Sequence, residues 1–217
     1  FHMNHSKLTT LKNITERYDG YGQSIRRVME QKTKYPGIVG VVADIIQVDK
    51  KYETAVETAL GGNIQNIVTE DESTAKEMIS LLKKNRYGRA TFLPLTTVSA
   101  QSGRIKPEVL GEHGVIDCVA ALVKKEKKYD ALIQYLLGGF VLVDTIDHAI
   151  ALGKKYRHTL RIVTLEGELL RPGGSMSGGA YKNSSNLLGR RHEMETLQQK
   201  IEKSQSSIDR LKKKTES

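Results

Sequence analysis

The stretch LLRPGGSMSGG, from Leu169 to Gly179, is the part of this sequence that most constrains the fold. Two glycine pairs flank three small or flexible residues, directly after an apolar, strand-like stretch. Glycine loses more backbone entropy on folding than any other residue, so this clustering needs a structural reason. Either the backbone takes positive φ, or another surface approaches too closely for a Cβ. A flexible linker is the alternative, but Arg171-Pro172 stiffens the chain before the glycines and a helical segment follows shortly after them, which favours close approach.

The charge of the chain is concentrated at its two ends. The net charge is +9 over 217 residues, with +4 in residues 1–34, +4 in residues 181–217 and only +1 between them. A basic excess suggests an acidic partner such as nucleic acid. A solvated surface is the more common reason for any single charge run, so this alternative stays open.

The cysteine count, the spacing of the histidines and the length of the apolar runs limit the classes of protein to which this sequence can belong. Cys118 is the single cysteine, so no internal disulfide is possible, and the six histidines show no ligand spacing with it. We therefore expect no metal site. The apolar runs are too short to cross a bilayer and no signal peptide is visible, so we expect no membrane partner and a cytoplasmic location.

Both ends carry heptad-like patterns that predict helices. The C-terminal seam consists of Met194, Leu197, Ile201, Ser204, Ile208 and Leu211. A looser N-terminal seam consists of Leu8, Leu11, Thr15, Tyr18, Gly22 and Ile25. Each stretch is too short and too polar to be stable alone. We expect the two to pack on each other as an antiparallel coiled coil; the alternative is two ordinary amphipathic helices lying on the domain.

The centre of the chain contains an internal repeat. Residues 52–62 resemble residues 129–139 at an offset of 77, and both predict a short helix that ends at a glycine in a left-handed cap. A strand follows in each copy, then a helix that begins near Asp71 or Asp147 and ends in Lys-Lys-x-Arg, then a second strand. The predicted strands are 38–42, 64–68 and 91–95 in the first copy and 119–123, 140–143, 161–165 and 168–170 in the second.

These patterns together predict an α/β protein, in which helices and strands are mixed (α+β) along the chain. Its core is a pseudo-symmetric duplication of helix–strand units, flanked by antiparallel coiled-coil helices. The predicted division is an N-terminal coiled-coil segment at 1–34, subdomain I at 35–100, a linker at 101–114, subdomain II at 115–180 and a C-terminal coiled-coil segment at 181–217.

Known catalytic motifs do not fit this sequence. No G-x-x-x-x-G-K-[ST] string is present, and the run Gly174-Ser175-Met176-Ser177-Gly178 places methionine where a nucleophile elbow needs serine. We expect no catalytic residue, no cofactor and no small-molecule ligand. An enzyme with a ligand in the glycine loop is the rival hypothesis, and it would show a saturable ligand effect on the melting temperature.

Two basic clusters at predicted helix ends are candidates for nucleic-acid binding. The first is Lys83, Lys84, Arg86 and Arg89, with Tyr87 between them; the second is Lys154, Lys155 and Arg157, with Arg161 nearby and Tyr156 between them. Cations that follow a backbone and rings that stack on bases suit single strands. Cations are also common at helix C-termini for their own sake. Lys124, Lys125, Lys127 and Lys128 form a third candidate, for which a solvated face is the stronger alternative.

The glycine run, the duplicated core and the heptad ends together resemble the hinge domain of a bacterial structural maintenance of chromosomes (SMC) protein. The most specific match is Leu170 to Gly179, supported by Gly37-Ile38-Val39-Gly40 and Gly61-Gly62. The resemblance covers about residues 30–180. It implies a homodimer that joins two long coiled-coil arms for chromosome condensation and segregation in the nucleoid.

The resemblance also implies roles for particular residues. It places Gly173, Gly174, Gly178 and Gly179 at the dimer interface. It implies DNA binding, with single strands favoured, through basic residues near the junction of hinge and coil. For this role we select Lys83, Lys84, Arg86, Arg89, Lys154, Lys155 and Arg157. The alternative is a nucleic-acid-binding module that dimerises through its coiled coil rather than through the glycine run.

Overall fold

The computed structural model describes residues 2–16, 18, 20–99, 104–180 and 187–215. Residues 101–103 of the predicted linker, and 181–186 and 216–217 of the predicted C-terminal segment, lie outside the described residues. The helices are α1 (His2–Glu16), α2 (Gln23–Met29), α3 (Val42–Ile45), α4 (Glu53–Leu60), α5 (Glu72–Asn85), α6 (Pro107–Leu110), α7 (Asp130–Leu137), α8 (Ile146–Lys155) and α9 (Leu187–Thr215), with 3-10 turns η1 (Lys50–Tyr52), η2 (Gly61–Gln65), η3 (Val119–Leu122) and η4 (Lys127–Tyr129). The strands are β1 (Ile38–Val41), β2 (Gln47–Val48), β3 (Ile67–Thr69), β4 (Phe92–Pro94), β5 (Val115–Cys118), β6 (Val123–Lys124), β7 (Phe140–Val143), β8 (Arg161–Thr164), β9 (Leu169–Leu170) and β10 (Met176–Ser177).

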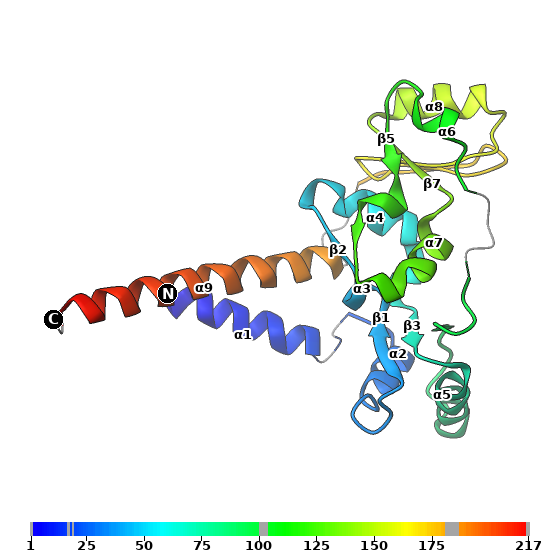
Figure 1. Cartoon of the computed structure of the whole chain (residues 1–217). Coiled ribbons are helices and arrows are strands. Elements are labelled where there is room, and N and C mark those ends of the chain that lie inside the picture. Colours follow the sequence, from blue (N-terminus) through cyan, green and yellow to red (C-terminus); the bar gives the residue numbers. More distant parts are fainter. Residues whose placement is uncertain (1, 17, 19, 100–103, 181–186, 216–217) are drawn as a thin grey trace.

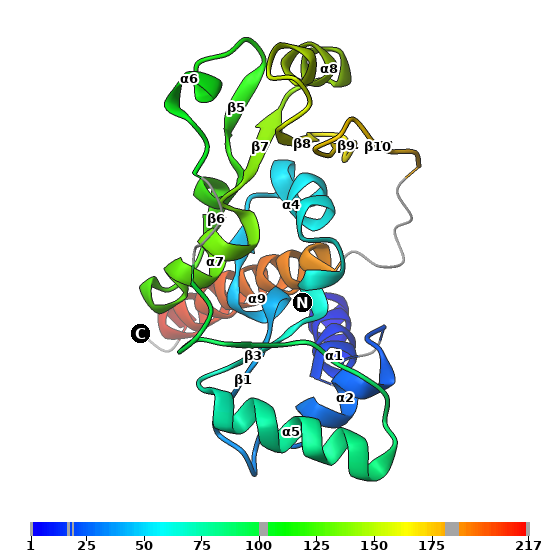
Figure 2. The same cartoon turned by 90° about the vertical axis from the view of Figure 1, so that its right-hand side faces the viewer.

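The duplication predicted from the sequence is confirmed by the sheet topology. In the first copy β3 pairs with β1 antiparallel and with β4 parallel. In the second copy β7 pairs with β5 antiparallel and with β8 parallel. Even the irregularities match, because a register shift lies between Ile38 and Gly40 in β1 and between Val115 and Asp117 in β5. Figure 2 shows the two copies at opposite ends of the molecule.

The two copies meet in a shared centre. Strand β2 of the first copy pairs antiparallel with β6 of the second, with Gln47 opposite Lys124 and Val48 opposite Val123. Helices α4 and α7 lie beside this ladder (Figure 1), and Val56, Leu132 and Ile133 are almost fully buried in one core that draws on both copies. Burial of such side chains contributes about 1.5–3 kcal/mol each, so neither copy is expected to be stable without the other.

The second sheet is longer than the first. Strands β9 and β10 extend it beyond β8 to give the order β10-β9-β8-β7-β5, whereas the first sheet ends at β4. Arg171, Pro172, Gly173, Gly174 and Ser175 form the turn from β9 to β10. The run that opened the sequence analysis therefore forms the outermost hairpin of the larger sheet.

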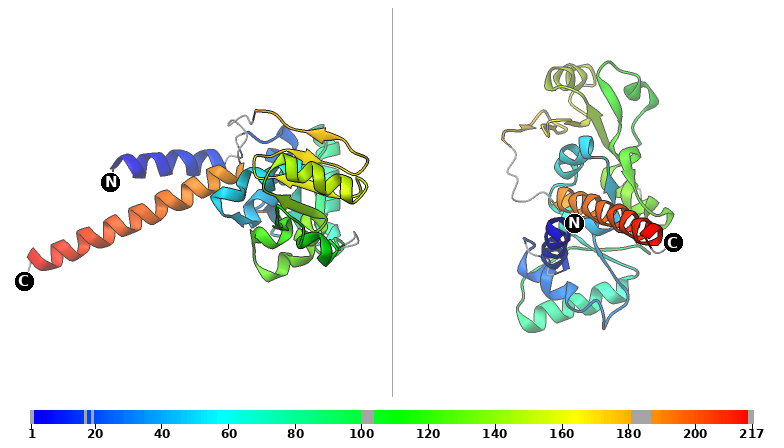
Figure 3. Two further views of the ribbon diagram at one scale, coloured as in Figure 1. Left: turned by 90° about the horizontal axis from the view of Figure 1, so that it is seen from above. Right: turned by 90° about the vertical axis from the view of Figure 1, so that its left-hand side faces the viewer.

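The terminal helices project together from one side of the α/β core (Figures 1 and 3). They run antiparallel, and Lys7 of α1 forms an ion pair with Glu193 of α9 at 2.5 Å. Leu8 and Leu197 are buried, and Ile201, Ser204 and Ile208 are half-buried between exposed neighbours, as the predicted seam requires. Leu211, in the last turns of α9, is 66% exposed, and the C-terminal end of α9 extends past α1 (Figure 1).

The N-terminal seam does not continue as one helix to Ile25. Helix α1 ends at Glu16 and α2 begins at Gln23. Between them Tyr18 takes φ +54° and Gly20 takes φ +90°, both in the left-handed region, where an α-helix cannot continue. The prediction of a seam through Gly22 to Ile25 was wrong because heptad spacing was counted across this turn.

Several local predictions in the repeat also need correction. Residues 119–123 were predicted as a strand, but 119–122 form η3, and the strand equivalent to β1 is β5. Ile64 lies in η2, so the strand β3 begins later than expected. Neither glycine forms the predicted left-handed cap, because Gly138 has φ −64° and Gly61, although its φ is +53°, has ψ −132°. The helix starts near Asp71 and Asp147 are as predicted: Asp71 caps α5, and Asp147 lies in the first turn of α8, which Thr145 caps by accepting a hydrogen bond from the His148 N–H.

None of the helices in the described part of the chain combines the length and the apolar character that crossing a membrane requires.

Candidate dimer interface and nucleic-acid surfaces

The first glycine pair makes a tight turn that fixes the β9–β10 hairpin. The Gly173 N–H donates to the His158 carbonyl at 2.9 Å, and the Gly174 N–H donates to the Arg171 carbonyl at 3.1 Å. Gly173 has φ +92° and Gly174 has φ +96°. An L-residue rarely adopts this conformation, so the turn selects glycine at both positions.

The second glycine pair follows β10 at the exposed edge of the sheet. Met176 of β10 is 51% exposed, although it is a large apolar side chain. A Cβ on Gly179 would meet no atom within 4 Å, and one on Gly178 would lie 3.1 Å from the flexible Glu168 side chain. Within the described residues the edge is therefore open, and the close approach predicted for these glycines is not made by the chain itself.

The first basic cluster lies at the C-terminal end of α5. Lys83, Lys84, Arg86 and Arg89 are all exposed. Arg86 has φ +54° and ends the helix, and the Ser24 hydroxyl of α2 donates to the Arg89 carbonyl at 2.7 Å. Arg27 of α2 stacks over the Tyr87 ring at 5.0 Å. The structure therefore adds a fifth cation, from α2, to this cluster.

The second basic cluster lies at the equivalent end of α8. Lys154, Lys155 and Arg157 are exposed, and Arg157 has φ +56°, as Arg86 has in the first copy. Lys155 is not free, because its ammonium lies 2.6 Å from the Glu112 carboxylate. The Tyr156 phenol donates to the same carboxylate at 2.9 Å.

The two clusters are not brought together. Helices α5 and α8 lie at opposite ends of the molecule (Figures 1 and 2), as the pseudo-symmetry of the copies requires. A single bound strand would have to cross the whole domain to contact both. They are therefore two separate candidate surfaces.

The Glu112 contacts give a prediction about acid stability. The hydrogen bond from Lys155, and next that from Tyr156, hold the pKa of Glu112 below its ordinary value. A carboxyl whose pKa is lowered by folding stabilises the folded state above its unfolded pKa, and that contribution is lost as the pH falls through its folded pKa. We expect Glu112→Gln to be less stable than the parent protein at neutral pH, with a difference that shrinks as the pH falls below the ordinary glutamate pKa and vanishes below the lowered pKa of Glu112. Urea unfolding at a series of pH values measures this, and parallel stability profiles would contradict it.

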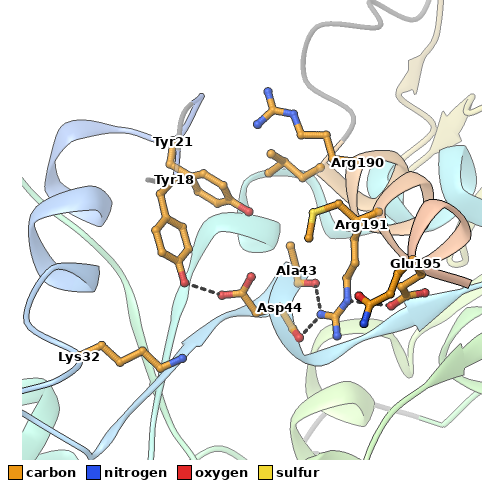
Figure 4. Close-up of a pocket in the computed structure, with 11 residues that line it drawn as sticks. Tyr18, Tyr21, Lys32, Ala43, Asp44, Arg190, Arg191 and Glu195 are labelled. Carbon is orange, nitrogen blue, oxygen red and sulfur yellow. Dashed lines mark hydrogen bonds and ion pairs between the residues drawn. The ribbon is translucent and has the colours of Figure 1, made fainter. Parts of the chain in front are cut away.

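The junction between core and coil contains the most extensive polar network (Figure 4). Arg191 of α9 donates to the carbonyl oxygens of Ala43, at 3.0 Å, and of Asp44. The Tyr18 phenol donates to the Asp44 carboxylate at 3.0 Å, and the Val41 N–H donates to the same oxygen at 3.1 Å. The network thus ties α9 and the turn after α1 to one residue of the core.

Burial first, and then the Asp44 carboxylate, raise the pKa of both Tyr18 and Tyr21. Both phenols therefore remain protonated donors at neutral pH. Beside them is a cavity of about 420 Å³ between α9 and the core, and Lys32, Arg190 and Arg191 line part of it. A second cavity shares Lys32 and Arg191 and adds Lys124 and Lys125.

A second anchor of the coil is a carboxylate beneath the first turn of α9. Glu57 of α4 is only 6% exposed and accepts a hydrogen bond from the Leu188 N–H at 2.8 Å. The first N–H groups of a helix have no intrahelical partner, and a carboxylate there also interacts favourably with the helix dipole. Glu57 therefore caps α9 from another element.

The sequence analysis missed Lys32, Arg190, Arg191 and Glu57 as residues of this junction. The dibasic pair Arg190-Arg191 at the start of the C-terminal seam was a usable signal for it. Glu57 gave no such signal, because a glutamate in a short helix normally faces water. Lys124 and Lys125, considered only as a third candidate, lie close to the junction cations.

The described residues offer little to covalent or metal chemistry. No group of three histidine, cysteine, aspartate or glutamate side chains among them could hold a metal ion. Burial raises the pKa of the Cys118 thiol, which lowers the thiolate fraction and makes the sulfur a poor nucleophile at neutral pH.

The fold and these surfaces define a duplicated α/β domain carried at the end of an antiparallel pair of helices. Residues 35–153 match the family of SMC proteins, flexible hinge domain. The chain belongs to this family, and the resemblance seen in the sequence is confirmed.

Relatives of known sequence support the assignment. The chain is 39% identical over 199 residues to the chromosome partition protein Smc of Bacillus subtilis and 34% identical over 206 residues to that of Lactiplantibacillus plantarum. These alignments cover 90% and 94% of this chain but only 17% of each relative. The chain thus spans about one sixth of the length of these relatives.

Solved hinge structures have the same fold. The asymmetric dimer of the Geobacillus stearothermophilus SMC hinge domain matches with a TM-score of 0.88 and 33% identity, covering 98% of this chain and 86% of that one. The Pyrococcus furiosus SMC hinge domain matches with a TM-score of 0.61 and 26% identity, covering 85% of this chain and 97% of that one.

Proposed function

We propose that this hinge domain joins two copies of its chain through the glycine-bearing edge of the larger sheet. The observation that carries the proposal is the open edge of β10, next to Gly173, Gly174, Gly178 and Gly179, with the exposed Met176 on it. An unpaired edge strand presents free N–H and C=O groups and is a template for pairing with another chain. The hinge of Geobacillus stearothermophilus, which has the same fold, was crystallised as a dimer.

The receiving surface in the partner is proposed to be the shorter sheet. Its last strand, β4, has no neighbour equivalent to β9. The Leu95 N–H donates to the Thr69 carbonyl of β3. Because the backbone groups of successive strand residues alternate between the two sides of the strand, the backbone groups of Phe92 and Pro94 face the open edge. Pro94 has no N–H, so a partner strand would find carbonyl acceptors there and the N–H of Phe92. Each copy then supplies one edge and receives the other, as a two-fold dimer requires.

The dimer is tested by the solution mass of the chain over a dilution series. Light scattering should give about twice 24.2 kDa, persisting on dilution. A stable monomer would remove assembly as the main function and leave the basic surfaces in first place.

The proposed cellular role is chromosome condensation and segregation in the nucleoid of a bacterial cytoplasm. The curated relatives are named chromosome partition proteins, and α1 and α9 leave the core together as the start of an arm. Two such chains joined at their hinges would link two arms. The hinge itself is proposed to act by assembly and not by catalysis.

DNA binding, with single strands favoured, is proposed for the exposed cations of the two helix ends and of the junction. Lys83, Lys84, Arg86 and Arg89 act together with Arg27 and Tyr87; Lys154, Lys155 and Arg157 form the second surface. The first surface has the stronger support, because Lys83, Lys84, Arg86 and Arg89 form no ion pairs within the described chain, although Arg27 pairs with Glu30 at 3.4 Å. In the second surface Lys155 already holds Glu112.

The double variant Lys83→Glu, Lys84→Glu tests the first DNA surface. We expect weaker binding of a single-stranded oligonucleotide and a salt dependence smaller by about two phosphate contacts, with unchanged unfolding because both side chains are exposed. The matched control is Lys12→Glu, Lys200→Glu, which makes the same charge change on the coil. An unaltered titration curve in fluorescence anisotropy would count against this cluster.

A further inference from the structure

A pocket of about 370 Å³ lies in the second copy, between α6, the end of α8 and the start of β8. Figure 1 shows α6 and α8 at the end of the molecule opposite α5. Arg104, Lys106 and Arg161 stand on its rim. All three are exposed, and no ion pair joins any of them to a carboxylate of the described chain. Arg161 lies 5.9 Å from the ring centroid of Phe140, which positions the guanidinium without neutralising it. Three uncompensated cations around one hollow favour an anion.

The floor of the same pocket is apolar. Val109 of α6 is almost fully buried there, and Leu160 and Tyr156 pack against the same small core cluster. Thr159 adds a hydroxyl to the lining. A phosphate alone needs no apolar floor, whereas a ring attached to a phosphate does. The volume lies near the lower end of the range of about 300–1,000 Å³ for small-ligand sites.

The acidic groups around the pocket leave its charge positive. Glu112 is already engaged by Lys155 at 2.6 Å and by the Tyr156 phenol. Glu108 of α6 is the other neighbouring carboxylate, and its charge acts on the Tyr156 phenol. Lys154 and Arg157 extend the positive region along the end of α8.

We propose that this pocket binds a nucleotide, with the phosphate held by Arg104, Lys106 and Arg161 and the base lying on Leu160 and the Tyr156 ring, which Val109 supports from the core side. The nucleotide is either free or one residue of a single strand, since both present the same chemistry. The site deepens the DNA binding proposed for the α8 end, but it stands apart from the α5 cluster and from the coil junction.

The test compares dTMP and a fluorescein-labelled thymidine tetranucleotide as probes of the intact chain. Arg104→Glu with Lys106→Glu is the pocket variant, and Lys12→Glu with Lys200→Glu is the control of equal charge change. We expect the pocket variant to bind the probes about tenfold or more weakly, because two charge-assisted contacts are lost. The control should bind as the parent protein does. All four side chains are exposed, so folding is retained, and equal melting temperatures verify this.

The two probes separate the two sources of the ligand. Competition by dTMP against the tetranucleotide indicates that a free nucleotide suffices, and binding of the tetranucleotide alone indicates a residue within a strand. Gly139 lines the pocket, so its amide signal in a ¹H–¹⁵N spectrum should shift when a probe that binds is added. Equal affinity of pocket variant and parent, or an equal loss in the control, overturns the proposal.

The Lys83→Glu, Lys84→Glu protein distinguishes this proposal from the one above. If it binds the tetranucleotide as the parent does while the pocket variant does not, the α5 surface fails and the pocket stands. If the pocket variant alone behaves as the parent, the pocket fails and the α5 surface stands.

Discussion

The double variant Gly178→Glu, Gly179→Glu is expected to be a folded monomer, with half the solution mass of the parent protein. Gly179 has φ +134°, which a side chain rarely adopts, and both positions lie at the exposed edge after β10. Two carboxylates there repel the equivalent pair of a second copy and block the backbone approach. The core is untouched because a Cβ at Gly179 meets no atom and one at Gly178 meets only the flexible Glu168 side chain.

A matched control separates a blocked interface from added charge. Gly22→Glu with Gly62→Glu adds the same two charges at positions where a Cβ meets nothing within 4 Å and φ is not positive. This protein should remain a dimer by light scattering. Dimers of the Gly178→Glu, Gly179→Glu protein at low concentration would refute the interface, and because α1 and α9 are intact in it, they would favour dimerisation through the coil.

The repeat made most of the core predictable. The strand predicted at 140–143 is β7, and the strand predicted at 161–165 is β8, which ends one residue earlier. The helices around residues 53–60, 72–85 and 130–137 were also predicted correctly, because each combines an apolar pattern with a charged or glycine boundary. An arginine with positive φ follows the second helix of each copy, at the place where the two copies carry the same Lys-Lys-x-Arg string: Arg86 is the C-cap of α5, and Arg157 lies two residues after the end of α8. Local chemistry that is repeated in the sequence is repeated in the backbone.

Predictions failed where tertiary contacts decide the conformation. Residues 119–122 are apolar enough for a strand, but they form a 3-10 turn because β6 must reach β2 of the other copy. Gly138 looked like a left-handed cap, yet its φ is −64° and its N–H donates to the Gln134 carbonyl as in a continuing helix. Apolar pattern alone does not distinguish these cases.

The basic clusters show a similar limit for function. Sequence spacing located both at helix ends, and the structure agrees, but pseudo-symmetry then separates them to opposite ends of the domain. The cations that do converge on the coil junction, Lys32, Arg190 and Arg191, come from distant parts of the chain. Convergence of this kind depends on the path of the chain and not on any local motif.

Glu57→Ala is expected to loosen the attachment of the coil and to lower the free energy of unfolding by about 2–4 kcal/mol. The substitution removes the acceptor of the Leu188 N–H and leaves that donor buried without a partner. It also removes a negative charge from the N-terminus of α9. Urea unfolding measures the stability, and hydrogen exchange of the Leu188 amide, which should become faster, measures the loss of the cap itself.

Glu53→Ala is the matched control, one helical turn away on α4. Glu53 is also 6% exposed, but its Oε1 atom has no hydrogen-bond partner and lies 3.8 Å from the His192 ring nitrogen. Both substitutions delete the same atoms and leave similar cavities, so the difference between them isolates the cap. We expect Glu57→Ala to be less stable than Glu53→Ala by about 1–2 kcal/mol. Equal losses, with unchanged exchange at Leu188, would mean that α9 is held to the hinge by Arg191 and apolar packing alone.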